Sequence, residues 1–402
     1  MRELGEFALI DRINAGRVQA PGVLLGPGDD AALVAAADGR FVVTTDMLVQ
    51  DRHFRLDWSG PEDIGRKAIA QNAADVVAMG AAPTAFVVAL GCPADTPLAL
   101  VDGLADGMWA EAARAGASIA GGDLVRSRDL VISITAFGDL RGGAPITRSG
   151  ACVGDIVAIA GRLGWSAAGL DAFTAGVTGA EVAEALAAHR VPQPQYAAVL
   201  DALERGPIWG PDSPTPQHVS VRSGACVDSG SDGPPREMPS AAAIGELDQA
   251  ATGETRAHAI PDGNLVDRSS PSVTGEPTMT GSRDIGLHAL TDVSDGLLAD
   301  LGHIAAASGV AIDLDSAALR DPALERVAAV LDADAAQWIL TGGEDHAFAG
   351  TWAPDRPLPA GWVAIGRVVA GHGLSVDGVA QVGDGGWESF HGADSAIGDR
   401  PR

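Results

Sequence analysis

Six aspartates of this 402-residue chain stand at expected strand ends, at a Gly-Gly turn or on the edge of a helix. Carboxylates gathered at such places repel one another, and few lysines or arginines accompany them. A hard divalent cation with oxygen ligands usually neutralises this repulsion. Taken singly, each aspartate is best read as a surface residue; together they predict Mg²⁺-bridged phosphates, with the protein positioning the reactants. The six are Asp30, Asp46, Asp75, Asp123, Asp292 and Asp295.

The stretch 26–46 contains the first of these carboxylates. A Gly/Pro turn places Asp29 and Asp30 in a loop, and two apolar runs follow, joined by Asp38-Gly39. An Asp-Gly pair between apolar runs is typical of a hairpin turn. We therefore expect an antiparallel hairpin that brings Asp46 back towards Asp29 and Asp30. The alternative is a solvated acidic loop.

A helix is expected over residues 61–79, because Ser59-Gly60-Pro61-Glu62 resembles a capping box with proline near the first helical position. Gly80 is a natural residue to follow its C-terminus. Gln71, Asn72 and Asp75 interrupt its otherwise small and apolar surface. A buried Asp75 is costly unless it is paired or binds metal, so the helix gives a second indication of a carboxylate site.

Two further junctions combine a strand with small residues and carboxylates. A short strand over 118–120 runs into Gly121-Gly122-Asp123, a place where the backbone can approach a ligand closely. The strand before residue 291 leads to an apolar helix that Ser294 can cap, with Asp292 and Asp295 facing outward. Helix N-termini bind anions, so this second junction suits phosphates.

No nucleophile–base pair accompanies the carboxylates. The three cysteines are isolated and no GxSxG is present. Lys67 is the only lysine, and the glycines of a phosphate-binding GxxxxGK[ST] loop do not surround it. The Gly-rich loop over residues 161–170 is weak support for phosphate binding, because glycines also serve packing. We therefore expect no residue that acts as a nucleophile or a general base.

Composition excludes several classes of protein. The acidic residues number 53 against 27 lysines and arginines, and the net charge of −26 disfavours nucleic-acid binding. Three scattered cysteines without CxxC spacing argue against a disulfide framework and fit a reducing compartment. No basic-then-apolar leader and no apolar run of membrane-spanning length is present. We expect a cytoplasmic protein with no membrane association.

The length of the chain favours two domains over one core. Residues 207–283 are rich in Pro, Ser, Gly and Asp and lack apolar periodicity, which predicts a disordered insertion; an extra, poorly packed subdomain is the alternative. The expected parts are an N-terminal domain over 1–149, a C-terminal domain over 150–206 and 284–402, and the insertion over 207–283.

Seven motifs occur in a characteristic order: GDDAA, TTDMLV followed by His53, NAADVVAMGA, GGDLVRS, TRSG, TDVSDGL and TGGEDHAF. In this order they resemble the thiamine-monophosphate kinase family, within the superfamily of aminoimidazole-ribonucleotide synthetase. The resemblance implies an α+β, two-domain synthetase-superfamily fold and a homodimer whose N-terminal domains join their sheets into a β-barrel. It also implies ATP-dependent phosphorylation of thiamine phosphate to thiamine diphosphate, with several Mg²⁺ ions.

The resemblance assigns roles to particular positions. The tail reads GWESF where the family tends to have a histidine before the phenylalanine. The implied Mg²⁺ positions are Asp30, Thr44, Thr45, Asp46, Asp75, Asp123, Asp292 and Asp295; the implied ATP contacts are Gly122, Asp123, Arg148 and Ser294; the implied substrate contacts are His53, Glu344 and Trp387.

The implied chemistry agrees with the residues. A phosphate monoester has a second pKa of about 6, so the acceptor is largely ionised at pH 7 and gains little from a general base. Direct in-line transfer from ATP is expected. Two alternatives remain: another ATP-using enzyme of the superfamily, such as aminoimidazole-ribonucleotide synthetase, or a non-catalytic acidic metal-binding protein.

Overall fold

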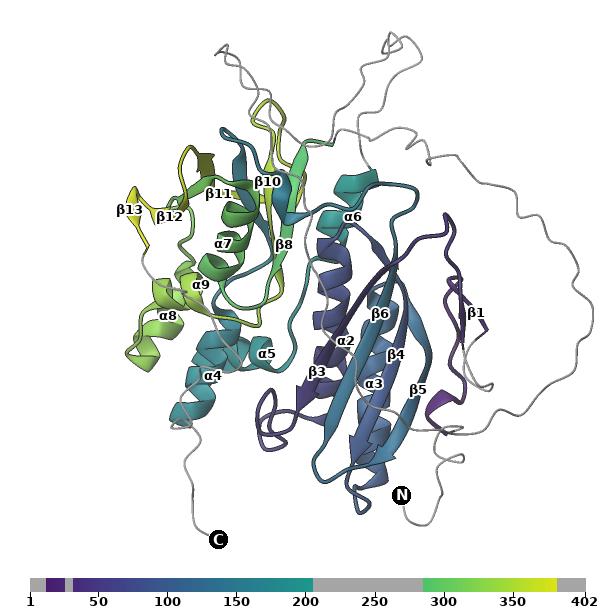
Figure 1. Cartoon of the computed structure of the whole chain (residues 1–402). Coiled ribbons are helices and arrows are strands. Elements are labelled where there is room, and N and C mark those ends of the chain that lie inside the picture. The colour runs from purple at the N-terminus through teal and green to yellow at the C-terminus, as the bar shows by residue number, and fades with distance from the viewer. Residues whose placement is uncertain (1–11, 26–31, 205–284, 382–402) are drawn as a thin grey trace, which may run out of the picture. The chain divides into compact units, whose positions relative to one another are not determined.

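Two β-sheets form the frame of the protein, which we describe from a computed structural model (Figure 1). The structure describes residues 12–25, 32–204 and 285–381. The expectations for Asp29, Asp30, residues 207–283 and Trp387 lie outside these ranges. Within them, no helix combines the length and the apolar character needed to cross a membrane.

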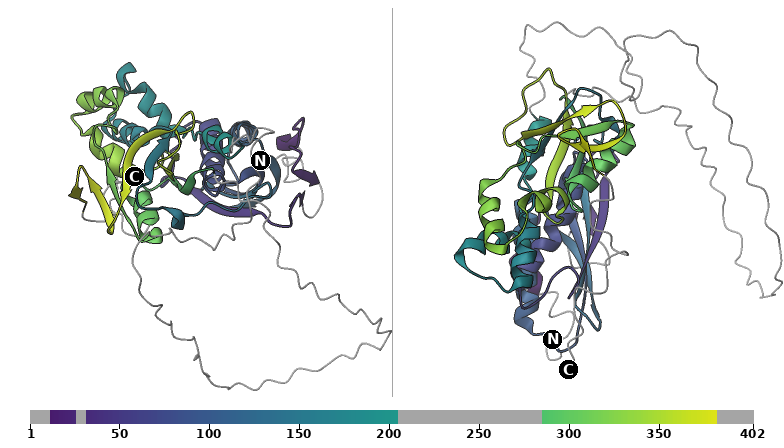
Figure 2. Two further views of the ribbon diagram at one scale, coloured as in Figure 1. Left: turned by 90° about the horizontal axis from the view of Figure 1, so that it is seen from above. Right: turned by 90° about the vertical axis from the view of Figure 1, so that its left-hand side faces the viewer.

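The first sheet has four strands in the order β3-β6-β4-β5, antiparallel except for the parallel pair β4–β5. Helices α2 and α3 pack on one of its faces, which we call the inner face, and a two-stranded ribbon, β1–β2, pairs separately (Figures 1 and 2). The elements are β1 Val23–Leu25, β2 Leu33–Val34, β3 Val42–Val49, α2 Pro61–Ala78, β4 Ala82–Cys92, α3 Leu98–Arg114, β5 Ser118–Arg126 and β6 Val131–Asp139.

The second sheet has seven strands in the order β13-β12-β9-β11-β7-β10-β8, all antiparallel except β12 with β9. The mixture of two sheets and their helices confirms the predicted α+β class. The remaining elements are β7 Ile156–Ala160, α4 Trp165–Ala175, α5 Ala183–Arg190, α6 Tyr196–Glu204, β8 Leu287–Val293, α7 Leu297–Ser308, β9 Ala311–Leu314, α8 Pro322–Leu331, α9 Ala335–Thr341, β10 Ala347–Trp352, β11 Val363–Val369, β12 Gly373–Val376 and β13 Val379–Ala380.

Strand β10 shows how the second sheet is covered on both faces. Its side chains alternate, as a period of two requires. Ala347 and Ala349 belong to the core made with α4, α7 and α8, whereas Phe348 and Trp352 belong to the core that also contains α2 and the first sheet. Helix α2 is therefore covered from several sides, and 13 of its 18 residues are buried.

The helix boundaries follow the sequence signals closely. Helix α2 begins at Pro61, and Gly80 adopts φ +75° just beyond the C-cap, as predicted. The predicted capping box of Ser59 and Glu62 is wrong by one residue, because the N-cap is Gly60, whose N–H donates to the Asp63 carboxylate. Asp321 caps α8 by accepting bonds from Ala323 N and Leu324 N. Proline at the first position and glycine after the last turn are sufficient local signals, which is why the predicted ends of α2 are confirmed.

The predicted hairpin over 26–46 is wrong in its pairing. Strand β2 pairs with β1, and β3 pairs with β6, with Asp46 opposite Ile134. The Asp38-Gly39 turn is present, with φ +77° at Gly39, but the strands on its two sides have different partners. A turn fixes only the local direction of the chain, and here tertiary pairing decides the register.

The Gly121-Gly122-Asp123 segment is also not a turn. It lies inside β5, paired with residues 87–89 of β4. A Cβ atom on Gly122 would lie 2.1 Å from the carbonyl oxygen of Val88. The glycine therefore permits two backbones to approach each other, rather than a backbone and a ligand as the sequence suggested.

Candidate functional site

Strand β3 and helix α2 bring the first carboxylates together. Thr44 and Asp46 lie on the inner face of the first sheet, as alternate residues of β3 do. The Thr44 hydroxyl donates to Asp75 Oδ2 at 2.8 Å, and Asp46 N donates to Asn72 Oδ1 at 2.9 Å. The polar residues that interrupt the apolar surface of α2 thus face β3.

The second half of the chain adds Asp292 from the end of β8. Asp292 is 4% exposed, and its Oδ2 lies 3.1 Å from His346 Nδ1. The charge of Asp292 also acts on Asp75, in the first half of the chain. The pKa of Asp75 is raised to about 7, by burial first and then by the charges of Asp292 and Asp46. Carboxylates far apart in sequence therefore share one site, as the sequence predicted, although Asp292 is buried and does not face outward.

The same repulsion acts on the neighbouring aspartates. Burial, with the charge of Asp292, raises the pKa of Asp46 and of Asp295. For His346, burial acts to lower the pKa, but the hydrogen bond to Asp292 and the surrounding carboxylates outweigh it, and the pKa is raised. Among the described residues, His346 makes the only salt bridge to these four aspartates, so the site is short of positive charge.

The donor set fits Mg²⁺, which prefers carboxylate and hydroxyl oxygens. The oxygens do not converge on one point, however. In the part of the chain that the structure describes, the only group of three potential ligand atoms within 4.8 Å of one another is at Cys152, Asp155 and His288. The carboxylates of Asp46, Asp75, Asp292 and Asp295 do not form such a group.

Asp300 replaces Ser294 in the expected capping role. Its Oδ2 accepts bonds from the backbone N–H groups of Ser294, Asp295 and Gly296 at 3.0–3.2 Å, and Gly296 is the N-cap of α7. The prediction that Ser294 caps the helix is wrong, because an acidic side chain one turn inside the helix satisfies these donors. Burial and the charge of Asp292 raise the pKa of Asp300 to about 7.

The backbone N–H groups of the Gly-rich loop before α4 likewise already donate to a carboxylate. Asp345 accepts bonds from the backbone N–H groups of Gly164 and Ser166, the latter at 2.9 Å. These donors are therefore not open to a phosphate, and the loop serves packing, as the more cautious interpretation of its glycines allowed.

Two of the expected Mg²⁺ positions lie on the other face of the first sheet, which we call the outer face. Thr45 alternates with Thr44 and Asp46 along β3, so its side chain points to the opposite face. Asp123 lies in the same cross-strand row as Ala89, Ser133 and Met47, and this row also faces outward. Within this chain, Thr45 and Asp123 do not join the carboxylates of the inner face. Gly122 pairs with Val88 in the row of Asp46, on the inner face. Burial raises the pKa of Asp295, and the charge of Arg148 opposes part of that rise.

His53 and Glu344, which are expected to contact the substrate, come from different halves of the chain. Val49 N donates to His53 Nδ1 at 3.0 Å, so this nitrogen is the acceptor and a neutral ring carries its proton on Nε2. Glu344 adopts φ +63°, and its N–H donates to Ser294 O at 2.7 Å. Burial would raise the pKa of Glu344, but the charge of Lys67 and its hydrogen bond lower it to about 2.

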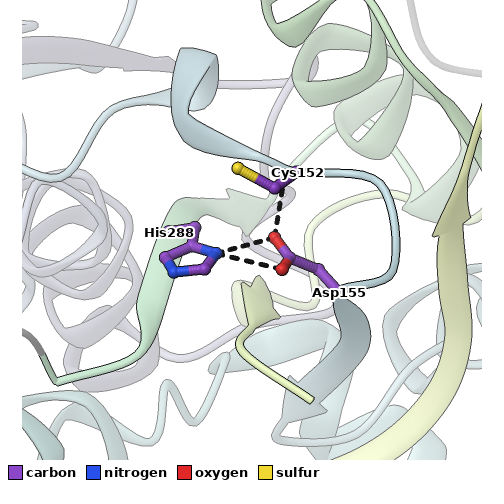
Figure 3. A group of neighbouring side chains, drawn as sticks. All are labelled: Cys152, Asp155 and His288. Atoms are coloured by element: carbon purple, nitrogen blue, oxygen red, sulfur yellow. Dashed lines mark hydrogen bonds and ion pairs between the residues drawn. The ribbon is translucent and has the colours of Figure 1, made fainter. Parts of the chain in front are cut away.

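Figure 3 shows a second cluster, made of Cys152, Asp155 and His288. Asp155 accepts a bond from Cys152 N at 2.9 Å and lies 2.9 Å from His288 Nδ1. Cys152 and His288 each have a further interaction. Because Asp155 is buried and already bonded, we assign the cluster a structural role, in which it fixes the turn before β7 to the start of β8.

Sequence reasoning missed His346 and Asp300 and assigned no role to Lys67. Each carries a signal that could have been read. Asp300 lies four residues after a glycine that begins an apolar helix, and His346 follows two acidic residues at a strand start. Lys67 is the only lysine of the chain.

Comparison with known proteins gives one family match and full-length relatives. Residues 28–140 match the family model "AIR synthase related protein, N-terminal domain". The thiamine-monophosphate kinase of Mycobacterium tuberculosis (strain ATCC 25618 / H37Rv) is 46% identical over 97% of this chain and 93% of its own. The thiamine-monophosphate kinase of Corynebacterium glutamicum is 35% identical over 96% and 94%.

Solved structures agree with this fold. The crystal structure of thiamine-monophosphate kinase from Stenotrophomonas maltophilia K279a has a TM-score of 0.65 at 29% identity, covering 94% of this chain and 98% of its own. A structure of AaThiL complexed with AMPPCP and TMP has a TM-score of 0.63 at 24% identity, with 97% and 98% covered. The E. coli hydrogenase maturation protein HypE, at 19% identity, has a TM-score of 0.59 over 95% of both chains.

Proposed function

Because the chain belongs to the thiamine-monophosphate kinase family, we infer that it transfers phosphate from ATP to thiamine phosphate and forms thiamine diphosphate. The observation that carries this function is the meeting of Asp46 and Asp75 from the first half of the chain with Asp292 from the second. A non-catalytic acidic metal-binding protein would also gather carboxylates, but the full-length similarity to kinases favours the enzyme. The full-length relatives favour this kinase over aminoimidazole-ribonucleotide synthetase.

We propose a single in-line displacement in which the protein supplies position and charge. The acceptor phosphate is largely ionised at pH 7. The barrier is therefore the approach of two polyanions, and the chain's own cation beside the carboxylates, Arg148, can offset part of the repulsion. An ionised acceptor needs no general base, so its own phosphate oxygen can act as the nucleophile.

Mg²⁺ fits the oxygen donors of the site. We propose that Thr44, Asp46, Asp75, Asp292 and Asp295 hold it, with Asp30, Thr45 and Asp123 as further positions implied by the resemblance. When bound, Mg²⁺ neutralises charge on the transferred phosphoryl group. The other assignments stay as proposed: Gly122, Asp123, Arg148 and Ser294 contact ATP, and His53, Glu344 and Trp387 contact thiamine phosphate.

The test of this function is a coupled assay with two readouts. ATP consumption is expected only when thiamine phosphate is present, with thiamine diphosphate as the product. With ATP made chiral at the γ-phosphorus, the product should carry the inverted configuration, as one displacement requires. Turnover with phosphoribosylformylglycinamidine in place of thiamine phosphate would contradict the assigned substrate, and net retention would contradict direct transfer.

We also propose a cytoplasmic homodimer, in which the outer faces of two N-terminal sheets join into a barrel. Val43, Met47 and Val125 lie on this face and are each more than half exposed, an unusual surface for a monomer. The two sheets support the division into an N-terminal domain, 1–149, and a C-terminal domain, 150–206 with 284–402.

Met47→Glu should convert the dimer to a monomer in light scattering, because a carboxylate at the centre of an apolar interface loses its water without gaining a partner. The control is Val363→Glu, which adds the same charge at an exposed position of β11 in the second sheet. A Met47→Glu protein that stays dimeric would contradict the proposed interface.

A further inference from the structure

The only lysine of the chain lies in the middle of the buried helix α2. Lys67 is 2% exposed, while most charged side chains of the described residues lie at the surface. An ammonium group taken out of water is costly unless it is paired and hydrogen-bonded. Lys67 must therefore be held by strong contacts, and their identity indicates its role.

The ammonium group of Lys67 contacts both described residues that are expected to bind thiamine phosphate. Lys67 Nζ donates to the carbonyl oxygen of His53 at 3.0 Å and to Glu344 Oε2 at 2.6 Å. His53 lies in the loop after β3, and Glu344 lies before β10, so one side chain connects the two halves of the chain. The Glu344 side chain keeps 36% of its surface exposed, and a ligand can therefore still reach it.

The backbone around Glu344 makes this support important. Glu344 and His346 both have positive φ, at 63° and 51°, a conformation that non-glycine residues seldom adopt. Such a loop keeps its shape only where its surroundings determine it. Lys67 supplies one such contact from the side of α2, and Ser294 O, which accepts the Glu344 N–H, supplies another.

We propose that Lys67 is a positioning residue for the acceptor: it fixes the Glu344 carboxylate at a set distance from the His53 loop, so that both meet the aminopyrimidine of thiamine phosphate. A carboxylate accepts hydrogen bonds from an exocyclic amino group, and it does so best when it is ionised and held in one place. This inference rests on the proposed function. The competing interpretation is that the pair is only a tie between the two halves of the fold.

The test separates the two roles with a pair of neutral substitutions. Lys67→Met leaves an unpaired carboxylate, so it should lower the melting temperature and raise the KM for thiamine phosphate at least about tenfold, with a smaller change in the KM for ATP. The double variant Lys67→Met/Glu344→Gln removes both charges. It should regain most of the lost thermal stability but keep the raised KM for thiamine phosphate.

A matched control is available on the same helix. Arg66 donates to Glu111, a fully buried carboxylate away from the acceptor contacts. Arg66→Met should cost stability without a selective change in the KM for thiamine phosphate. Recovery of that KM in the double variant, or an equal rise of both KM values in Lys67→Met, would show a purely structural tie. A wild-type protein that does not consume thiamine phosphate would instead contradict the proposed function itself.

Discussion

Asp75→Asn should lower kcat at least about 100-fold while the protein stays folded. Outer-shell changes around a metal already cost about 10–100-fold, and this change removes the charge and one oxygen of a proposed direct ligand. Asp75 lies where α2 meets β3, with the charges of Asp46 and Asp292 close enough to raise its pKa. Asparagine keeps the size of the side chain and can accept the Thr44 hydroxyl bond. The measurement is kcat at saturating ATP and thiamine phosphate, beside a thermal melt.

The fold should tolerate this change, because burial of an ionised Asp75 is itself unfavourable. Asp129→Asn is the control: it makes the same chemical change at an exposed carboxylate, 4.0 Å from the exposed Arg128, where a surface pair contributes little. The control should keep full activity. Near-normal turnover of Asp75→Asn at millimolar Mg²⁺ would remove Asp75 from the proposed ligands.

Local signals predicted elements well and pairings poorly. The ends of α2 and the start of α8 follow from proline, glycine and a capping carboxylate within a few residues. The partner of β3 is β6, about ninety residues further along the chain, and no signal in the stretch 26–46 records it. A hairpin turn is compatible with two strands that pair with each other or with other strands, so the sequence alone could not decide.

The site shows a similar limit at the level of single residues. The sequence predicted that carboxylates from two regions would gather, and Asp46, Asp75 and Asp292 do so. It could not separate Thr44 from Thr45, because their faces depend on which side of the sheet α2 covers. A bulge between β4 and β5 also shifts the register before Asp123, and a bulge has no reliable sequence signal.

Gly107→Ala should destabilise the protein by about 1–3 kcal/mol, the usual cost of overpacking. Its added Cβ would lie 2.0 Å from the carbonyl oxygen of Glu62 and 2.8 Å from the carbonyl carbon, both backbone atoms of α2. Helices α2 and α3 would have to move apart. Because α2 carries Lys67, Asn72 and Asp75, kcat should fall together with the melting temperature.

Gly302→Ala makes the same substitution inside α7 and is the matched control. Its Cβ would meet only Leu374 Cδ1, at an ordinary 3.7 Å. Replacing glycine in a helix that has room stabilises a protein by about 0.4–1 kcal/mol, because the unfolded chain loses freedom. The two variants share this gain, so their difference in melting temperature isolates the helix contact. Equal stability of the two variants would contradict the close contact between α2 and α3 at Gly107.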